Sequence, residues 1–519
     1  MRDFQSNGRS AAISANGMIA TSHPDAARIG LEILQEGGSA ADAAVAASAV
    51  LAVVEPQNAG LGGDTFYLHC TAAGSVSGYN GSGRTPMALD AAAVGAVGQE
   101  SVHSVTVPGA VDALLHLHAG HCRFPLDRLL RPAIALARDG FLVQPRVAWD
   151  WQYGRERLAR SVSGGQFWGR DVVPGSRVVN RPLARTLQDI AANGRDGFYE
   201  GETAQSIVQT LSRLGGYHRM EDFAMHRGEA VTPIQTSYRG LDILECPPNG
   251  QGITVLMMLN MLDTLDMAAI WADPVRYAHL LAQVSQLAYA ERDHWVCDPE
   301  SGSTPLATLL SARYADYLRA RLDPARALPA PAFEGPEHKD TVYLACVDRN
   351  GNAISFINSI FTDFGSTIYD EASGILLHNR GASFSNEPGH VNALAPGKRP
   401  MHTIIPGLAM KNGRAIMPFG VMGGHYQATG QVHLLSAMLD AGLDPQQALE
   451  LPRHFLSAGR LELETGVSVE VEQALRAKGH DIVRSVRPIG GGQAIWMDHE
   501  NGILIGGSDP RKDGCALGY

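Results

Sequence analysis

Apolar positions follow helical spacing in some segments of the chain and strand spacing in others. A period of 3.6 residues predicts helices at 110–120, 126–139, 183–193, 202–214, 253–265, 274–291, 431–441 and 445–451. Nearer the start, Pro24 opens one helix and Ser39 caps the next. The capped helix runs from Ala40 to Val54 and is apolar almost all round, so we expect it to be buried.

Strand patterns are expected at 17–22 and 65–71, dominate 341–389 and return near the C-terminus. An apolar run that begins after Thr341 turns at 348–351 and comes back over 353–359. The proline-containing segment 326–339 has weak periodicity and is the most linker-like part of the chain. Helices and strands grouped in this way favour a layered α/β or α+β architecture.

Length and charge narrow the classes of function. The 519 residues suffice for a large core, and the formal net charge is −11 with the 42 Lys and Arg residues scattered. This charge argues against a nucleic-acid or anionic-membrane partner. The N-terminus lacks the apolar region of a secretory signal, and no segment approaches the roughly 18 apolar residues of a membrane span. With six widely separated cysteines, these features predict reduced thiols and a cytoplasmic protein.

Motifs for metal and cofactor chemistry are missing from the sequence. Neither an HExxH motif nor the close His/Asp spacing of a metal site occurs, so we expect no metal and no cofactor. The glycine-rich loop 60–64 lacks the GxGxxG spacing of a dinucleotide site. The tract Gly81-Ser82-Gly83 lacks the GxSxG spacing of a serine hydrolase.

Thr341 stands at the mouth of an apolar strand, directly after the linker-like segment. A threonine in that place is commonplace in folded proteins. A cut before Thr341, however, would give one residue both a hydroxyl nucleophile and a free α-amine, with a pKa of about 7.7–8.0 that suits a general base. Downstream, the loop containing Gly423 and Gly424 could offer two backbone N–H groups to an oxyanion. Together these features suggest a self-activating amide hydrolase.

Short motifs in a fixed order make the chain resemble the gamma-glutamyltransferase family of N-terminal-nucleophile hydrolases over nearly its whole length. They are Ala26-Ala27-Arg28-Ile29-Gly30, Gly37 to Ala43, Glu55-Pro56, Gly60-Leu61-Gly62-Gly63, Val107-Pro108-Gly109, Gly197 to Gly201, Pro247-Pro248, Asp340-Thr341, Gly351-Asn352-Ala353, Phe364-Gly365, Ser373 to Leu377, Lys398-Arg399-Pro400, Gly423-Gly424 and Ser508 to Arg511. Each motif alone is weak, but the ordered set is highly specific.

The resemblance implies an α+β fold, a four-layer αββα sandwich, made as one precursor that cleaves itself between Asp340 and Thr341. Residues 1–340 would form a large chain and residues 341–519 a small chain, held together as a heterodimer that could pair into a dimer of heterodimers. Thr341 would be the nucleophile, Ser359 the second hydroxyl residue that orients it, and Gly423 and Gly424 the oxyanion hole.

Departures from the transferases concern the substrate. The family holds the donor's α-amino group with an asparagine and two acidic residues, and these positions correspond here to Phe361, Arg380 and Ser383. Facing a guanidinium, an ammonium would meet like-charge repulsion. The family's paired serines become His402 and Thr403. The arginine that binds the donor's carboxylate is out of register, with Arg84 two places later.

The strand 356–359, the loop 80–84 and the segment 401–406 are most similar to the oxamate amidohydrolase branch, which converts oxamate to oxalate and ammonia in purine breakdown. Oxamate is a small amide with a neighbouring carboxylate and no amino group. Arg380 could grip that carboxylate, and Phe361 could form a wall. For Arg380 the competing interpretation is a structural ion pair, and for His402 it is a hydrogen-bonded structural histidine.

Two alternatives stay open from the sequence. One is a glutathione hydrolase or gamma-glutamyltransferase, which would release glutamate from glutathione. The other is an uncleaved, non-catalytic binding homologue, favoured by Val342, which replaces the threonine usual after the nucleophile. A single band on a denaturing gel would support the second alternative.

Overall fold

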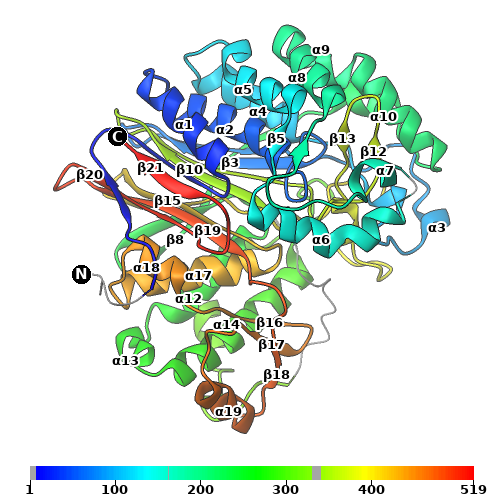
Figure 1. Cartoon of the computed structure of the whole chain (residues 1–519). Helices are drawn as coiled ribbons and strands as arrows, with labels where there is room; N and C mark the ends of the chain where they lie inside the picture. Colours follow the sequence, from blue (N-terminus) through cyan, green and yellow to red (C-terminus); the bar gives the residue numbers. More distant parts are fainter. Residues whose placement is uncertain (1–6, 162, 330–340) are drawn as a thin grey trace.

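Two stacked sheets form the middle of the molecule, and helices cover the outer face of each (Figure 1). This computed structural model describes residues 7–161, 163–329 and 341–519. The order of layers is helix, sheet, sheet, helix, so the predicted αββα sandwich is confirmed. Asp340 and residues 330–339 of the predicted linker lie outside the described residues.

The first sheet combines strands from both sides of residue 341. Its order is β21 (Cys515–Gly518), β2 (Met18–Thr21), β10 (Val342–Val347), β11 (Ala353–Ser359), β3 (Asp64–Cys70), β4 (Val76–Asn80) and β7 (Glu229–Val231). Strand β10 pairs with β11 on one side and with β2 on the other, both antiparallel. The predicted small-chain strands are therefore hydrogen-bonded to predicted large-chain strands within one ladder.

The second sheet likewise draws on both parts of the chain. Its order is β1 (Ala12–Ser14), β20 (Ile503–Ser508), β19 (Gly491–Asp498), β15 (Arg414–Met422), β14 (Gly407–Lys411), β9 (Leu241–Glu245) and β8 (Ile234–Tyr238). Every neighbouring pair is antiparallel.

Side chains alternate between the two faces of β10, so this one strand contributes to two hydrophobic clusters. Val342 and Leu344 pack into the cluster beneath the first helical layer, whereas Tyr343 and Ala345 pack between the two sheets. Successive side chains of a strand point to opposite faces, so a strand buried on both faces is apolar at every position. This is the continuous apolar run seen in the sequence.

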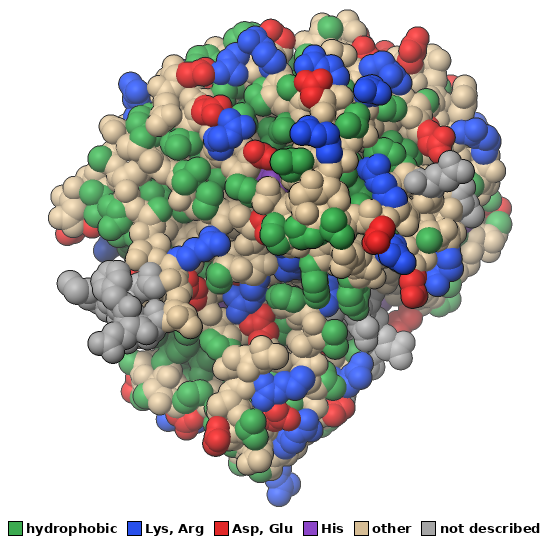
Figure 2. All heavy atoms as spheres, viewed as in Figure 1, with side chains coloured by type: hydrophobic (Ala, Val, Ile, Leu, Met, Phe, Trp, Pro, Cys, Tyr) green, Lys and Arg blue, Asp and Glu red, His purple; other side chains and the backbone are tan. Residues whose placement is uncertain are grey.

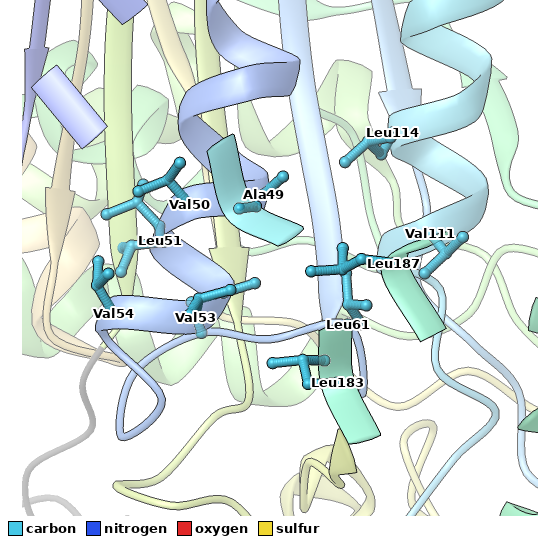
Figure 3. Close-up of a cluster of buried hydrophobic side chains, with 14 of the residues drawn as sticks. Ala49, Val50, Leu51, Val53, Val54, Leu61, Val111, Leu114, Leu183 and Leu187 are labelled. Carbon is cyan, nitrogen blue, oxygen red and sulfur yellow. The ribbon is translucent and has the colours of Figure 1, made fainter. Parts of the chain in front are cut away.

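The first helical layer lies over the first sheet. Its helices are α1 (Pro24–Gln35), α2 (Ala40–Val54), α4 (Ala110–His121), α5 (Leu126–Asp139), α8 (Arg181–Asn193), α9 (Asp196–Tyr199), α10 (Glu202–Arg213) and α11 (Met220–Met225). All of α2 is buried, as predicted, and Ser39 and Asp42 form a capping box at its start. Figure 3 shows its C-terminal half among leucine and valine side chains of α4 and α8.

The second helical layer covers the second sheet, and a small subdomain extends beyond it. The layer holds α12 (Gly252–Leu262), α13 (Met267–Trp271), α14 (Pro274–Trp295), α15 (Leu306–Leu309), α16 (Ala312–Arg319), α17 (Tyr426–Leu439) and α18 (Pro445–Glu450). The subdomain consists of β16 (His454–Ser457), β17 (Arg460–Leu463), β18 (Asp481–Arg484) and α19 (Val469–Ala477).

The remaining elements connect these layers or lie beside them. They are α3 (Ala91–Val94), η1 (Val102–Ser104), β5 (Phe141–Leu142), α6 (Pro145–Ala159), α7 (Gly165–Trp168), β6 (Arg177–Val178), β12 (Tyr369–Asp370), β13 (Ile375–Leu376) and the 3-10 turn η2 (Arg380–Ser383). After β11, the segment predicted as strand-rich is therefore mostly loop, and that part of the prediction is wrong. Its polar groups are satisfied by tertiary contacts; for example, Asp370 accepts hydrogen bonds from Ser206 and Thr210.

Surface and thiol features complete the description. The face shown in Figure 2 mixes Lys and Arg with Asp and Glu side chains and shows no continuous basic patch. All six cysteines lie in the described part of the chain as free thiols.

Within the described part of the chain, no helix is long and apolar enough to cross a bilayer. The same residues contain no cluster of three or more His, Cys, Asp or Glu side chains arranged to hold a metal ion.

Candidate active site

Thr341 lies at the entry of β10, fully buried, beside two polar side chains. Its Oγ1 is 3.2 Å from Ser359 Oγ and 3.3 Å from Gln427 Nε2. The register explains the first contact, because Val342 pairs with Asn358 and the next positions outward are Thr341 and Ser359. The two hydroxyl residues singled out in the sequence are thus brought together by the β10–β11 hairpin.

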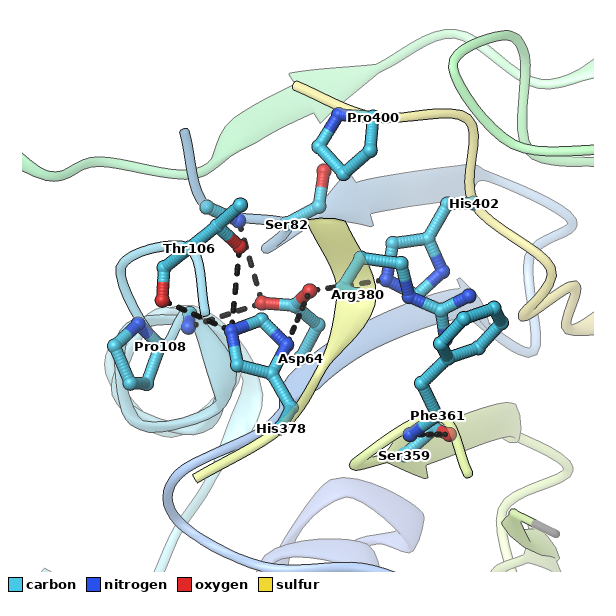
Figure 4. Close-up of polar contacts among 12 residues, drawn as sticks. Asp64, Ser82, Thr106, Pro108, Ser359, Phe361, His378, Arg380, Pro400 and His402 are labelled. Atoms are coloured by element: carbon cyan, nitrogen blue, oxygen red, sulfur yellow. Dashed lines mark hydrogen bonds and ion pairs between the residues drawn. The ribbon is translucent and has the colours of Figure 1, made fainter. Parts of the chain in front are cut away.

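Ser359, the last residue of β11, is fixed by the backbone that follows it. Phe361 donates its N–H to Ser359 Oγ at 2.9 Å, and it does so with a φ of +80°. A bulky residue in this left-handed region is uncommon and has to be held by its surroundings. The turn directs the Phe361 ring toward the guanidinium of Arg380 (Figure 4).

Gly423 and Gly424 form the loop between β15 and α17. Their φ angles are +117° and +59°, and a Cβ at Gly423 would lie 3.0 Å from the Cα of Gly490. The Gly424 carbonyl accepts hydrogen bonds from Gln251 Nε2 at 3.0 Å and from the Gln427 N–H at 3.3 Å. Since the carbonyl is held in this way and Gln427 also contacts Thr341, the loop is linked to the nucleophile candidate through Gln427. The role of its N–H groups as an oxyanion hole stays a prediction.

Arg380 opens the turn η2 and is entirely buried. Its Nη1 donates to Thr403 Oγ1 at 2.9 Å, and its guanidinium carbon lies 3.8 Å from the centre of the Phe361 ring. Within residues 7–161, 163–329 and 341–519, Nε and Nη2 have no hydrogen-bond partner. Burial lowers the pKa of Arg380 to about 9, although the nearby Asp64 opposes that shift. A buried guanidinium with an unused edge is a ready anion site.

Asp64, the first residue of β3, lies between two buried histidines (Figure 4). Its Oδ2 is 3.0 Å from His402 Nε2 and 3.5 Å from His378 Nδ1. Its Oδ1 accepts hydrogen bonds from the N–H groups of Gly83 and Gly109. Burial by itself would raise the pKa of Asp64, but His378, His402 and Arg380 together lower it to about 2. The carboxylate is therefore ionised, and its acceptor capacity is largely used.

Burial favours the neutral form of both histidines, and their tautomers follow from their partners. His402 Nδ1 accepts the Ile404 N–H, so its hydrogen is on Nε2 and is donated to Asp64. His378 Nε2 lies 2.9 Å from the Thr106 carbonyl oxygen and so carries the hydrogen there. Burial lowers the pKa of His402 to about 3 and also lowers the pKa of His378. His402 thus supports Asp64 from the same segment that supplies Thr403.

The other two predicted substrate residues have different surroundings. Ser383 uses its hydroxyl on the carbonyls of Arg380 and Met401, which fixes the η2 turn. Arg84 pairs with Asp298 and Glu300 at 2.8 and 2.7 Å and with Glu229 at 3.2 Å, and its side chain is 25% exposed. None of its recorded contacts is to Thr341 or Arg380, and its role in substrate binding stays a prediction.

The sequence analysis missed three residues of the site: Asp64, His378 and Gln427. For Asp64 a signal existed, since a carboxylate directly follows the Gly60–Gly63 loop at the start of an apolar strand. Gln427 was missed because helix α17 begins at Tyr426, five residues before its predicted start. No side chain caps this helix, so its N-terminus carries no sequence signal.

Comparisons with known proteins agree with this geometry. The family model for gamma-glutamyltranspeptidase matches residues 26–519. A glutathione hydrolase-like YwrD proenzyme of Bacillus subtilis is 38% identical, covering 98% of this chain and 99% of the relative, and an oxamate amidohydrolase proenzyme of Klebsiella pneumoniae is 34% identical with the same coverage. The crystal structure of a cephalosporin acylase from Bacillus halodurans superposes with a TM-score of 0.93, at 38% identity over 100% of this chain and 99% of that one. The chain therefore belongs to the gamma-glutamyltranspeptidase family, as a hydrolase of the N-terminal-nucleophile type.

Proposed function

We propose that the chain cleaves itself before Thr341 and then hydrolyses a small amide that carries a neighbouring carboxylate, with oxamate as the substrate. The observation that carries the substrate class is the Arg380 guanidinium, which is fully buried, faces the Phe361 ring and has Nε and Nη2 unpartnered in the described part of the chain. Phe361 is two residues from Ser359, which contacts Thr341. A carboxylate on Arg380 would therefore place an adjacent amide near Thr341.

The proposed reaction uses the liberated α-amine of Thr341 as its base. The amine takes the hydroxyl proton while Oγ1 forms a bond to the amide carbon, and the carbonyl electron pair moves to oxygen, where the N–H groups of Gly423 and Gly424 stabilise it. The proton then passes to the leaving nitrogen as the C–N bond breaks, which releases ammonia. Water gives a proton to the amine and attacks the ester, and Oγ1 recovers its proton as oxalate leaves. Self-cleavage would start with attack of Oγ1 on the Asp340 carbonyl.

Gamma-glutamyl compounds fit the same surroundings less well. Their donors carry an α-ammonium, which needs an acidic partner in a buried pocket. The carboxylate recorded beside Arg380 is that of Asp64, and it is already engaged by Gly83, Gly109 and His402. Glutathione hydrolysis nevertheless stays the second candidate, because the name of the 38% identical Bacillus subtilis relative points to it.

Intact mass spectrometry and a substrate panel test the proposal. The wild-type protein should yield two chains that begin at Met1 and Thr341, and Thr341→Ala should stay whole and inactive. Ammonia release from oxamate should exceed glutamate release from glutathione and amide cleavage of a cephalosporin. A whole but active wild-type protein would overturn the mechanism, and a preference for glutathione or the cephalosporin would overturn the substrate. An uncleaved, inactive wild type would favour the binding homologue.

Assembly and location remain predictions. We infer that the two chains stay together as a heterodimer because their strands share both sheets. A dimer of heterodimers and a cytoplasmic location are part of the same proposal.

A further inference from the structure

Gln427 is the second residue of helix α17 and is completely buried. Its side chain spans from the nucleophile to the backbone of Ile405. Nε2 lies 3.3 Å from Thr341 Oγ1, and Oε1 lies 3.2 Å from the Ile405 nitrogen. The helix that carries Gln427 starts directly after the Gly423-Gly424 loop, so the amide that contacts Thr341 comes from the element that follows the proposed oxyanion hole.

The partners fix which way the amide faces. A backbone N–H can only donate, so the atom next to the Ile405 nitrogen must be the carbonyl oxygen of Gln427. The atom next to Thr341 is then the NH₂ group, which can only donate. Gln427 therefore supplies a hydrogen-bond donor to the oxygen that the proposed reaction uses as nucleophile.

A donor in this place has its largest effect when Oγ1 carries negative charge. In the proposed reaction this happens twice: as Oγ1 loses its proton before the bond to carbon is complete, and as Oγ1 leaves the acyl-enzyme during hydrolysis. A hydrogen bond to a charged oxygen is roughly twice as strong as one to a neutral oxygen. The same donor also occupies one lone pair of the resting hydroxyl, which restricts how its hydrogen can point.

We propose that Gln427 is a catalytic residue, which stabilises the negative charge that develops on Thr341 Oγ1 during acylation and during ester hydrolysis. The inference rests on the proposed function, because it takes Thr341 as the nucleophile. It adds a donor from a side chain to those offered by the glycine loop, and it assigns that donor to the nucleophile oxygen rather than to the substrate oxygen.

Gln431 offers a matched control one turn further along the same helix. It is also buried, and its Nε2 donates to the Ile405 carbonyl at 2.8 Å. Gln427→Met and Gln431→Met each remove one hydrogen bond to the Ile405 backbone, but only the first removes a bond to Thr341. Gln431→Met also removes an interaction with the buried Glu245 carboxyl. A purely structural role therefore predicts that Gln431→Met loses at least as much activity as Gln427→Met.

The experiment measures kcat for whichever substrate of the panel above the wild type cleaves fastest, counted per cleaved molecule from intact mass. Gln427→Met should lower kcat by about 10- to 100-fold, less than the loss of an oxyanion-hole donor, because the hydrogen bond is long. Gln431→Met should change kcat by less than about threefold. Equal losses in both variants, with equal losses of thermal stability, would show that Gln427 only supports the loop.

Gln427→Glu adds a pH profile as a readout, which would not change if Gln427 only supported the loop. An ionised glutamate can only accept and would repel charge on Oγ1, whereas the protonated acid can donate again. The ratio of its kcat to the wild-type kcat should therefore rise as the pH falls from 8 to 5, and a flat ratio would overturn the inference. Thr341→Ala distinguishes failure of the proposed function from failure of this inference. If Thr341→Ala keeps its activity, the proposed function is wrong. If Thr341→Ala is inactive but the kcat of Gln427→Met equals that of Gln431→Met, only this inference is wrong.

Discussion

Arg380 and Arg84 are both arginines in segments that match the family, yet their surroundings are opposite. Arg84 is 25% exposed and pairs with the carboxylates of Glu229, Asp298 and Glu300. Arg380 is fully buried, lies on an aromatic ring and keeps two nitrogens without a partner in the described part of the chain. A guanidinium paired with several carboxylates suits a structural role, whereas a buried one with nitrogens left over is open to a partner such as water, an anion or a substrate. We therefore propose that Arg380 binds the substrate and that Arg84 stabilises the fold.

Removing each guanidinium in turn is the strongest test of this contrast between Arg380 and Arg84. Arg380→Ala should lower kcat/KM for oxamate by about 100-fold or more, because a buried, hydrogen-bonded charge pair with the substrate is lost. Arg380→Lys should restore little, since an ammonium cannot present two parallel donors. Self-cleavage, followed by intact mass, should proceed in both variants. If Arg380→Ala and Arg84→Ala lost the same activity, the contrast between the two sites would be wrong.

Arg84→Ala should act on stability instead. Asp298 is 1% exposed and would lose a charged partner, although the Arg399 N–H still donates to it. We expect a loss of about 1–3 kcal/mol in the free energy of unfolding, with Glu300, which is 68% exposed, contributing little. Urea unfolding of the inactive Thr341→Ala background, with and without Arg84→Ala, measures this loss. Unchanged stability together with a raised KM would indicate that Arg84 binds the substrate.

Stability at low pH should also differ between the surroundings of the two arginines. His378 and His402 lie near Arg380, whereas the recorded contacts of Arg84 include no histidine. The pKa of folded His402 is about 3, below its unfolded value near 6.5, so beneath pH 6.5 the unfolded chain binds the extra proton. The contribution of His402 to stability is therefore complete above about pH 6.5 and is lost as the pH falls toward 3, at up to about 1.4 kcal/mol per pH unit. His378 shifts in the same direction.

Urea unfolding of the uncleaved Thr341→Ala background between pH 8 and pH 5 measures this slope. His402→Gln should remove one histidine's share of it, whereas Arg84→Ala should leave the slope unchanged. Asp64, whose pKa falls from 3.8 to about 2, loses its contribution only below this range. An identical slope in the Thr341→Ala background with and without His402→Gln would contradict the assignment of His402 as a neutral buried histidine.

Much of the fold could be predicted from local patterns. Ser39, the apolar run to Val54 and the strand after Thr341 each carry a signal within a few residues, and the structure has the helix and the strand where they were expected. In the candidate site, the local sequence raised Thr341 and the glycine pair as possibilities, whereas Ser359 and the assignment of roles depended on the family resemblance. Its remaining members are joined by tertiary contacts that no local pattern encodes: Asp64 and His402 are 338 positions apart, and Thr341 and Gln427 are 86 apart.

The placement of β10 has a consequence for the life of the processed protein. The proposed cut falls at the margin of a strand whose neighbours, β2 and β11, lie on opposite sides of the cut in sequence. The two polypeptides would be joined by backbone hydrogen bonds between strands in the centre of the molecule. Neither could dissociate unless those strand pairs separated. Scission would thus be a one-way maturation: after denaturation, the severed halves would have to find each other again as two molecules, with no covalent tether to raise their local concentration.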